Sequence, residues 1–510
     1  MQNRNIYLDS LFSFSETQPG KTAFFEAETG FGLTYSELSS AVLRAAGAIL
    51  SAAGGPGGDL PVAVLTDRSP LAVAAFLGAA AAGRWYAAID AELPPERLKL
   101  MTALCRPAAL INASSLPDGG FSDICEENGC PYIPREVWTS AAEASRRDLP
   151  GRPAESPMFG IFTSGSTGTP KLVVKSRAAM ESFTGVYDST FGFSEEEIFG
   201  NQIPFYFDAS TKDIYSTVRL GASCVILPAK AFAFPVKLVD MLNENRISTA
   251  VWVPSALVSA AKFDVFSVSK PEYLKKVLFV GEKMPVKYLN VWRRALPDAE
   301  FVNLYGSTEV AGNSCYFRVR GDFDDSDILP VGRPFPGTRV FLLKKEGETY
   351  AGSDEGEICV AGPGLAEGYF GDPEKTASVF REITVGDFSG RVYFSGDTGR
   401  YDVAGELVCV SRKDSQIKHM GHRIELGEIE AAAVSCEGVG ESACFYDPEK
   451  ERIVLFFSAP SDISRELRRA LAAKLPKYMI PSKFVWRAGL PHNRNGKLDR
   501  AAMRAGMTSI

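Results

Sequence analysis

The sequence lacks a long hydrophobic run. Its longest apolar stretch, residues 71–83, is rich in alanine and is followed by Arg84, which makes it shorter than the roughly 20 residues of a membrane-spanning helix. The first residues, MQNRNIYLDSLF, contain no apolar segment of signal-peptide length. We therefore expect a chain with no membrane span and no secretory leader.

Cysteine and positive charge are also limited. The nine cysteines are scattered along the chain, which argues against a disulfide framework. Cys125 and Cys130 are close to each other, but no second pair lies nearby to complete a zinc site. Lys and Arg number 55 against 62 Asp and Glu, for a net charge of −7, which does not favour a nucleic-acid partner. We expect a reduced, cytoplasmic protein.

The composition is that of an ordinary globular protein. Hydrophobic residues make up 45% of the chain and charged residues 23%, which excludes disordered, collagenous and coiled-coil chains. Short β-rich runs alternate with helical patterns rich in Ala and Leu, which predicts parallel sheets covered by helices. The clearest runs are VAVL (62–65), ALIN (109–112), CVILP (224–228), TAVWVP (249–254) and KKVLFVG (275–281).

The pattern changes twice along the chain. After about residue 330 strand-like pieces shorten and turn signals become frequent, which indicates a smaller β-rich unit. From residue 412 a charged segment leads into two predicted helices, ELGEIEAAAV and the run SRELRRALAAKLPKYMIP, which Pro476 and Pro481 end. We predict an α/β fold with a large N-terminal domain of packed α/β sheets plus a β-rich subdomain, residues 1–411. A small α+β C-terminal domain, residues 412–510, follows.

The strongest local signal is the segment IFTSGSTGTPKLVV at 161–174. Gly165 and Gly168 allow the backbone to approach an anion closely. Exposed amides and the nearby hydroxyls can donate to phosphate oxygens, and Lys171 adds positive charge. The segment is not the common P-loop, because Pro170 stands where that pattern requires Gly. A flexible solvent loop is the alternative.

Three further segments carry polar residues of nucleotide chemistry. In VNLYGSTEV (302–310) an aromatic ring could stack on a base and Glu309 could bind Mg²⁺, although a capping loop with a buried Tyr would look the same. Asp397 follows a β-rich run and a Gly, which suits a carboxylate that holds ribose hydroxyls, with Arg412 nearby. In PHNRNGKLDR (491–500) a tight turn projects Lys497, which alone would suggest a solvated charge.

Taken in order, these segments resemble the adenylate-forming superfamily, and more narrowly its amino-acid-activating branch. The resemblance runs over essentially the whole chain, through landmarks such as LTYSEL (33–38), VGRPFPGTRV (331–340) and LPKYMIP (475–481). LFVGEKMPVKYLN, NLYGSTEV and QIKHMGHRIELGEIE are most similar to D-alanine–D-alanyl carrier protein ligases and stand-alone adenylation domains of nonribosomal peptide synthetases.

The resemblance implies ATP and Mg²⁺ as reaction partners. It assigns the β- and γ-phosphates to the loop, adenine to Tyr305, the α-phosphate to Thr308, Mg²⁺ to Glu309 and the ribose to Asp397 and Arg412. The full implied ATP site consists of Thr163, Ser164, Gly165, Ser166, Thr167, Gly168, Lys171, Asn303, Leu304, Tyr305, Gly306, Ser307, Thr308, Asp397, Arg412 and Lys497. Thr308, Glu309 and Lys497 are the implied catalytic residues.

Two positions depart from the family pattern. A third position, which matches the pattern, implies that the C-terminal domain moves. Ser307 stands where Pro is usual, and Ser411 replaces the usual Gly before Arg412. Asp414 matches the position about which the family's C-terminal domain rotates between the two half-reactions. Rotation would withdraw Lys497 and bring the segment near Gly421 to the active site. His419 and His422 could suggest a metal, but with only three histidines in the chain we favour a variable family position.

The resemblance also implies an amino-acid substrate. Asp208 falls where amino-acid-activating members carry the carboxylate that pairs with the α-ammonium; a helix cap is the alternative. The implied pocket is Asp208, Ala209, Lys212, Trp252, Leu278, Val280, Leu304, Gly312 and Asn313. Lys212 is unusual there: it could meet a polar or acidic side chain, or pair with Asp208 at i, i+4. The Ala209/Lys212 combination sets the pocket apart from what we expect for D-alanine.

Only ten residues follow Arg500, too few for a carrier domain, so we expect a separate phosphopantetheinylated carrier protein. Basic residues near the C-terminal helix, Arg465, Arg468, Arg469, Lys474 and Lys477, could steer an acidic carrier or simply be solvated. Two alternatives stay open: an acyl-CoA synthetase, against which Asp208 argues, and a non-catalytic binding protein, against which Lys497, Glu309 and Asp397 together argue.

Overall fold

The computed structural model describes residues 5–55, 57–165, 168–346, 349–352, 354–412, 416–492 and 498–505. The chain divides into two compact units. Unit 1 consists of residues 1–91, 102–162 and 172–413, and unit 2 of residues 92–101, 163–171 and 414–510. From the sequence we place the division at 411/412 and do not expect two short internal segments to group with the C-terminal part.

Two large sheets form the frame of unit 1. Their described strands are ordered β15-β14-β13-β12-β11-β9-β10-β1-β2 in one sheet and β19-β8-β7-β4-β3-β5-β6 in the other. The strands of the first are β1 Thr22–Glu26, β2 Gly32–Thr34, β9 Ile198–Asn201, β10 Ser223–Ile226, β11 Thr249–Trp252, β12 Lys276–Val280, β13 Glu300–Tyr305, β14 Cys315–Arg318 and β15 Arg333–Pro334. Those of the second are β3 Val62–Thr66, β4 Tyr86–Asp90, β5 Ala109–Asn112, β6 Tyr132–Ile133, β7 Pro157–Thr163, β8 Lys171–Ser176 and β19 Gly368–Tyr369.

Most neighbouring strands in these sheets are parallel. β11 pairs with β12 in parallel, with Val251 opposite Leu278, and β3 pairs in parallel with both β4 and β5. All five β-rich runs named above form strands. The predicted α/β fold is therefore confirmed.

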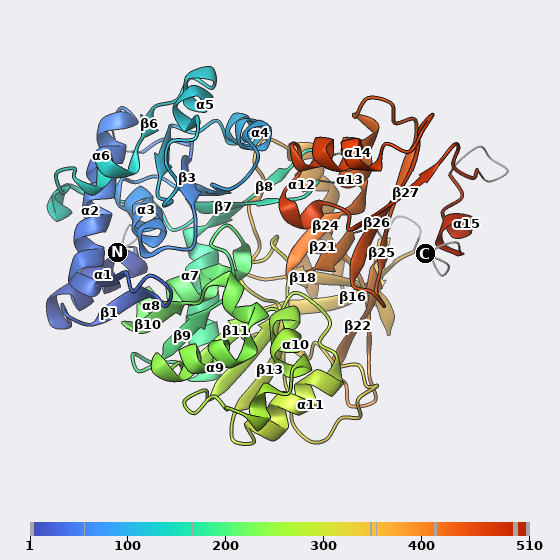
Figure 1. Ribbon diagram of the computed structural model, residues 1–510. Helices are drawn as coiled ribbons and strands as arrows, with labels where there is room; N and C mark the ends of the chain where they lie inside the picture. The colour runs from blue at the N-terminus through green and yellow to red at the C-terminus, as the bar shows by residue number, and fades with distance from the viewer. Residues whose placement is uncertain are drawn as a thin grey trace. The chain divides into compact units, whose positions relative to one another are not determined.

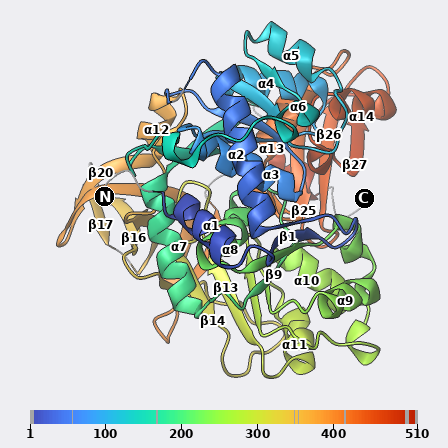
Figure 2. The ribbon, with the colours of Figure 1, turned by 90° about the vertical axis from the view of Figure 1, so that its left-hand side faces the viewer.

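Helices fill the space between the two sheets. α7 (Arg177–Phe191) and α8 (Thr211–Leu220) lie there, as Figures 1 and 2 show. One hydrophobic core joins side chains of both sheets to these helices, for example Phe159 of β7, Tyr215 of α8 and Leu278 of β12. Residues 211–218 of α8 are all buried, because the sheets cover the helix on opposite sides.

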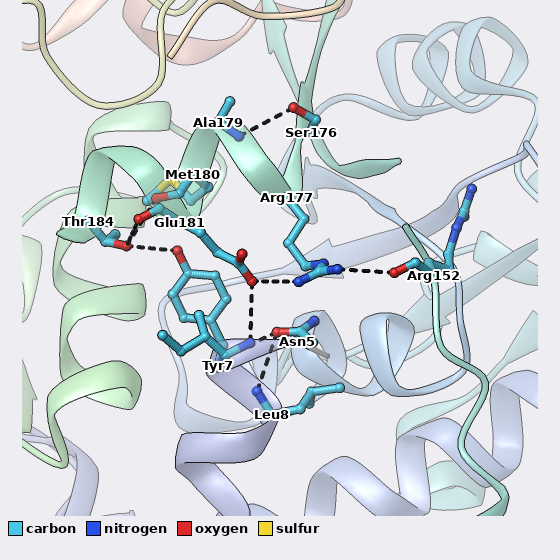
Figure 3. Close-up of polar contacts among 11 residues, drawn as sticks. Asn5, Tyr7, Leu8, Arg152, Ser176, Arg177, Ala179, Met180, Glu181 and Thr184 are labelled. Carbon is cyan, nitrogen blue, oxygen red and sulfur yellow. Dashed lines mark hydrogen bonds and ion pairs between the residues drawn. The ribbon is translucent and has the colours of Figure 1, made fainter. Parts of the chain in front are cut away.

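The first helix, α1 (Ile6–Thr17), is fixed to α7 by polar contacts. Asn5 caps its N-terminus by accepting from the backbone N–H groups of Tyr7 and Leu8 at 3.1 and 3.4 Å. The Tyr7 hydroxyl lies 2.9 Å from Oγ1 of Thr184, and the Ile6 backbone N–H donates at 3.3 Å to Oε1 of Glu181, which also pairs with Arg177 within α7 (Figure 3). This network holds the amino-terminal segment against the central helices.

The remaining helices of at least five residues cover the outer faces or join the strands. They are α2 Tyr35–Ala52, α3 Pro70–Ala81, α4 Pro95–Cys105, α5 Phe121–Glu127, α6 Arg135–Thr139, α9 Pro235–Glu244, α10 Pro254–Lys262, α11 Val286–Ala295 and α12 Pro373–Val379. The LTYSEL segment forms a capping box, in which Thr34 and Glu37 bond each other's backbone N–H groups at the start of α2. No helix among the described residues has the length and apolar character needed to cross a bilayer.

A third sheet of unit 1 follows residue 330, as the turn-rich sequence predicts. Its order is β17-β16-β18-β21-β20, with β22 paired to β21. The strands are β16 Arg339–Glu346, β17 Thr349–Gly352, β18 Glu355–Ala361, β20 Phe380–Val385, β21 Phe388–Tyr401 and β22 Leu407–Arg412.

In unit 2, the segment after residue 414 contains a hairpin, a three-stranded sheet and helices. The hairpin is β23 Gln416–His419 with β24 His422–Glu425, and the sheet is β25 Ser442–Asp447, β26 Arg452–Ser458 and β27 Lys483–Arg487. The helices are α13 Leu426–Val434, α14 Ser464–Ala472 and α15 Arg500–Ala505. Both helices predicted in this segment are therefore present, and they share a hydrophobic core that includes Ile429 and Leu467.

Candidate active site

Three polar side chains of unit 1 meet although they are far apart in sequence. Tyr305 is the last residue of β13, Asp397 lies in β21, and Arg412 ends β22, directly opposite Asp397 in the strand register. The Tyr305 hydroxyl donates to Oδ2 of Asp397 at 2.6 Å, and Nη1 of Arg412 donates to Oδ1 at 2.6 Å. The structure thus joins the residues predicted to bind adenine and ribose.

The electrostatics of this group favour a fixed carboxylate. Burial raises the pKa of Tyr305 well above its usual value and the Asp397 charge raises it further, so the phenol stays a donor. Each carboxylate oxygen has more than one acceptor position. Asp397 can therefore keep both protein donors and still accept from two vicinal hydroxyls, which is the chemistry that a ribose requires.

Glu309 follows β13 and is 1% exposed. Its Oε1 accepts from the Tyr369 hydroxyl at 2.8 Å. Carboxylate oxygen is the donor type that Mg²⁺ prefers, and such sites commonly use one or two carboxylates together with substrate phosphates. The residue present therefore fits the ion: Glu309 would hold Mg²⁺, and the ion would supply positive charge to the phosphate oxygens. Thr308 and Ser307, beside it, are half-buried.

Other residues at the C-terminal end of β13 have structural roles. Asn303 is buried and donates through Nδ2 to the Pro330 carbonyl at 2.8 Å, and Leu304 belongs to the central core. A Cβ on Gly306 would lie 2.9 Å from Cα of Asn313, so this position needs glycine. Asn303 and Leu304 therefore support the site from behind.

The glycine-rich loop, residues 163–171, belongs to unit 2. A Cβ on Gly165 would lie 1.9 Å from the Thr169 carbonyl oxygen, and Gly168 has φ +85°, so both positions need glycine. The Gly165 amide donates to Oε2 of Glu428 at 3.2 Å, and the Ser164 hydroxyl donates to the Arg423 carbonyl at 2.9 Å. A carboxylate on the Gly165 amide shows that the loop can present a backbone donor to an anion, as a phosphate requires.

Glu428 has a second partner within unit 2. Its Oε1 forms a 2.5 Å ion pair with Arg97, and both side chains are buried. Thr163 and Lys171 stand at the two strand ends that flank the loop. Ser166, Thr167, Asp414 and Lys497 lie outside the described residues, so the hinge role expected for Asp414, the catalytic role expected for Lys497 and the phosphate contacts of the two loop residues stay predictions.

A buried cluster of charges surrounds Asp208. The short 3₁₀ helix at 208–210 precedes α8, and the Asp208 carboxylate forms an ion pair with Lys175 of β8. Nζ of Lys175 also donates to the Val310 carbonyl at 3.3 Å. Burial lowers the pKa of Lys175 and raises that of Asp208, and the contact between them opposes both shifts. Glu309 raises the pKa of both groups, which places it near the pair.

Lys212 and Asp213 extend this cluster along α8. Both are 1% exposed, and among the described contacts Nζ of Lys212 has no hydrogen-bond partner. Asp213 accepts from Nδ2 of Asn201 at 2.9 Å. Lys212 therefore does not pair with Asp208 as the i, i+4 spacing suggests, and the Asp208 side chain binds Lys175 rather than capping α8.

The predicted substrate pocket divides between two faces of one sheet. Ala209, Leu278, Val280 and Leu304 belong to or pack on the same core as α8. Trp252 does not: it packs in a separate core on the other face, with its indole N–H donating to the Gly200 carbonyl at 2.7 Å. Successive strand residues point to opposite faces, so Val251, not Trp252, faces α8. Our assignment of Trp252 to the pocket is therefore wrong.

Gly312 and Asn313 line the turn beside Gly306. Gly312 has φ +61°, and a Cβ there would enter the Phe183 ring. Asn313 is buried, and its Oδ1 has no partner among the described contacts. Both remain candidates for the pocket wall.

The histidines of the hairpin have packing roles. The His422 ring stacks on Tyr478 with centroids 3.6 Å apart, and His419 meets Tyr446 edge-on. Burial lowers the pKa of His422 to about 3. These ring contacts explain why both histidines are present in the hairpin.

Sequence reasoning missed Lys175, the partner of Asp208. The signal was a lysine inside the otherwise apolar strand segment LVVKS, where a charge needs a partner. Asp213 was missed as well, because its neighbours in the helix draw attention only to Asp208 and Lys212.

Comparisons with known proteins identify the family of the chain. A family model described as AMP-binding enzyme matches residues 11–370, and one described as AMP-binding enzyme C-terminal domain matches residues 428–497. D-alanine–D-alanyl carrier protein ligase of Bacillus licheniformis is 28% identical, over 98% of this chain and 99% of that protein. A dimodular nonribosomal peptide synthase of Bacillus subtilis is 32% identical over 93% of this chain, and the match spans 20% of that protein.

The fold also matches a solved structure. The amide bond synthetase McbA from Marinactinospora thermotolerans superposes with a TM-score of 0.83 at 21% identity, over 98% of this chain and 99% of that one. At this identity the likeness establishes the fold alone. With family models matched over most of its length, the chain belongs to the AMP-binding enzyme family, the adenylate-forming enzymes.

Proposed function

We propose that this protein is an ATP-dependent, AMP-forming ligase that joins an amino acid to the phosphopantetheine thiol of a separate carrier protein. The Asp397 carboxylate, held by Tyr305 and Arg412, is the observation that carries the nucleotide part of the proposal. The amino acid and the carrier are supported by full-length relatives named D-alanine–D-alanyl carrier protein ligase.

The first half-reaction forms an aminoacyl-adenylate. The substrate carboxylate attacks the α-phosphorus of ATP, the bond to the bridging oxygen breaks, and pyrophosphate leaves. Asp397 orients the ribose, and the Tyr305 ring lies against adenine. The hydroxyls and amides of the loop stabilise the departing phosphates. In the second half-reaction the thiol attacks the acyl carbon and AMP leaves.

Lys497 is proposed to bring two anions together. A fixed ammonium near the carboxylate and the α-phosphoryl oxygens acts where negative charge builds in the transition state. We expect Lys497→Ala to lower amino-acid-dependent ATP–pyrophosphate exchange by about 10²–10³. Lys450→Ala, which removes an exposed lysine on the turn between β25 and β26, should leave the exchange unchanged. Exchange near the wild-type rate in Lys497→Ala would remove the lysine from the mechanism.

The acceptor is tested separately. AMP should be released faster when a phosphopantetheinylated carrier protein is the acceptor than when coenzyme A is the acceptor at the same concentration. A preference for coenzyme A would replace the carrier ligase with an acyl-CoA synthetase. Exchange absent with all amino acids would argue against adenylation itself.

A further inference from the structure

Cys125 and Cys130 are two neighbouring thiols to which the proposed ligase function gives no role. Cys125 lies in α5, and Cys130 follows the end of that helix, directly before the segment that forms β6 (Figure 1). Both residues belong to unit 1, and they are 1% and 9% exposed. β6 is the edge strand of the second large sheet and pairs in parallel with β5. The two thiols therefore lie in the turn that leads the chain into this edge.

This turn is a Schellman motif, in which a helix ends on a glycine and the following backbone N–H groups bond its last carbonyls. The Cys130 N–H donates to the Cys125 carbonyl at 3.0 Å, and the Gly129 N–H donates to the Glu126 carbonyl at 3.1 Å. Gly129 has φ +64°, the left-handed conformation that the motif requires. The side chains of the two residues joined by the outer bond commonly pack on each other. Here both are cysteines, so the backbone brings two thiols into contact.

The contact makes the two thiols unequal. A hydrogen bond between the side chains lowers the pKa of Cys130 and raises that of Cys125, and burial raises the pKa of Cys125 further. Cys130 is therefore both the more acidic and the more exposed thiol, with the larger thiolate fraction. Cys105 also lies near Cys130, but its Sγ donates to the Thr102 carbonyl at 3.5 Å, within its own helix.

The charges near the pair are negative. The charge of Asp118 reaches Cys125, and those of Asp118 and Glu136 reach the ring of Tyr132, the first residue of β6. Like charges repel, so an anionic reagent such as oxidised glutathione is held off, whereas neutral hydrogen peroxide is not. The same charges oppose ionisation of the thiols, so the pair responds to sustained rather than brief exposure to peroxide.

We propose that Cys125 and Cys130 form a reversible modification site, at which hydrogen peroxide converts the two thiols into a disulfide. The Cys130 thiolate attacks one peroxide oxygen, the O–O bond breaks and hydroxide leaves, so that a sulfenic acid forms. The Cys125 sulfur then attacks the sulfenic sulfur, the S–O bond breaks, and the hydroxyl leaves as water with the Cys125 proton. The pair loses two electrons to the peroxide, and a dithiol reductant returns them by exchange.

The contact between the thiols keeps this oxidation reversible. The second thiol traps the sulfenic acid before more peroxide converts it to a sulfinic acid, which thiols do not reduce. A sulfinate would also place an unpaired charge in a buried turn, at a cost to the edge strand that follows. The site is independent of the proposed ligase function.

The test measures the order in which the nine cysteines of the full chain react with hydrogen peroxide. Remaining thiols are blocked, and the protein is cleaved after Glu126 and Glu127, which separates the two cysteines unless a disulfide joins them. Exposure alone would favour Cys409, because the other eight are buried. We expect the Cys125–Cys130 disulfide in at least about half of the chains while less than about a tenth of Cys409 is modified. Dithiothreitol should restore both thiols.

Two variants separate the roles of the thiols. Cys125→Ser leaves Cys130 without a resolving partner, so Cys130 should accumulate sulfinic acid that dithiothreitol does not reverse. Cys105→Ser is the matched control: it removes another buried thiol near Cys130 and should form the disulfide at the wild-type rate. In the oxidised wild type, hydrogen exchange of residues 121–133 should slow, because the bond closes the end of α5.

Earlier oxidation of Cys409, or a disulfide between Cys105 and Cys130, would overturn the proposal. So would sulfinic acid on Cys130 of the wild type while Cys125 stays reduced. Faster hydrogen exchange of residues 121–133 after oxidation would show that the native turn does not accommodate the bond, which also contradicts it. The order of reaction is measured on the wild type, so the test does not depend on the folding of either variant.

Discussion

A carboxylate that is 4% exposed needs strong donors, and Asp397 receives them from two different strands. Tyr305 and Arg412 approach its two oxygens separately, so each donor fixes one end of the group. The arrangement turns a flexible side chain into a rigid acceptor. Its orientation is then independent of whether a nucleotide is present.

Removing the Tyr305 hydroxyl tests this rigidity. Tyr305→Phe deprives a buried carboxylate of one donor, which should lower the free energy of unfolding by about 1–3 kcal/mol. It should also raise the KM for ATP more than it lowers kcat, because the role proposed for Asp397 is to hold the ribose and not to contact the reacting atoms. Urea denaturation and steady-state kinetics measure the two effects.

Tyr316→Phe is the matched control. Tyr316 lies on β14, next to β13, and its ring packs against Phe335. Its substitution should change stability by less than about 0.5 kcal/mol, as surface and packing-neutral changes do. Equal losses in both variants would show that Asp397 does not depend on the Tyr305 hydroxyl.

At the level of single residues, motifs predict the functional residues that lie within them. They miss residues that reach the site only through the tertiary fold. Tyr305, Asp397 and Arg412 stand in recognisable segments, and the structure brings all three together. Lys175 stands in a strand that carries no motif, and only the packing of β8 beside residue 208 makes it a partner. Its importance follows from tertiary contact, which no local pattern encodes.

At the level of elements, strand positions are easier to predict than strand faces. The run TAVWVP predicts β11 correctly, yet Trp252 points away from α8 because alternation along the strand assigns it to the opposite face. An error of one residue along the strand therefore assigns a side chain to the wrong face of the sheet. Helix α8 shows the converse: it is buried on all sides, so amphipathic periodicity cannot reveal which side faces the substrate.

The hairpin of β23 and β24 should be sensitive to acid. Burial, with a smaller contribution from His419, lowers the pKa of His422 to about 3, whereas an unfolded histidine titrates near 6.5. The unfolded state therefore binds more protons, and the stabilisation is complete above pH 6.5 and declines as the pH falls toward 3. We expect a loss of roughly 1–2 kcal/mol between pH 6.5 and 5.

Hydrogen exchange of the hairpin and α13, corrected for the intrinsic rate, measures this loss. His422→Phe keeps the ring stacked on Tyr478 and should flatten the pH dependence. His492→Gln changes an exposed histidine and should retain it. An unchanged slope in His422→Phe would assign the acid sensitivity to other groups.

At the level of the whole molecule, the catalytic cycle is proposed to depend on the connection between the units. Asp414 matches the family's hinge position and lies outside the described residues. Proline fixes φ near −65°, so Asp414→Pro should restrict rotation there. We expect carrier aminoacylation to fall at least about 10-fold while pyrophosphate exchange stays near wild type, since only the second half-reaction needs the domain rotation.

Single-turnover assays with a preformed adenylate isolate that second step. Asp414→Ala, which leaves φ unrestricted, is the control and should support both half-reactions. Parallel loss of exchange and aminoacylation in Asp414→Pro would assign the residue a role in the fold rather than in rotation.

The overall architecture was predictable because it rests on repeated local patterns. Alternating strand and helix segments indicate the two large sheets, and the turn-rich sequence after residue 330 indicates the third. The grouping of residues 92–101 and 163–171 with unit 2 was not predictable, because it depends on contacts between segments that are distant in sequence.

The enclosed position of α8 has a consequence for how such enzymes change specificity. Positions 175, 208, 212 and 213 share one solvent-free charge balance, so replacing any one of them alone upsets the other three. At the substrate site proposed around Asp208, new preferences should therefore arise through joint substitutions. A library that randomises the four codons together should yield folded enzymes that no scan of single replacements contains.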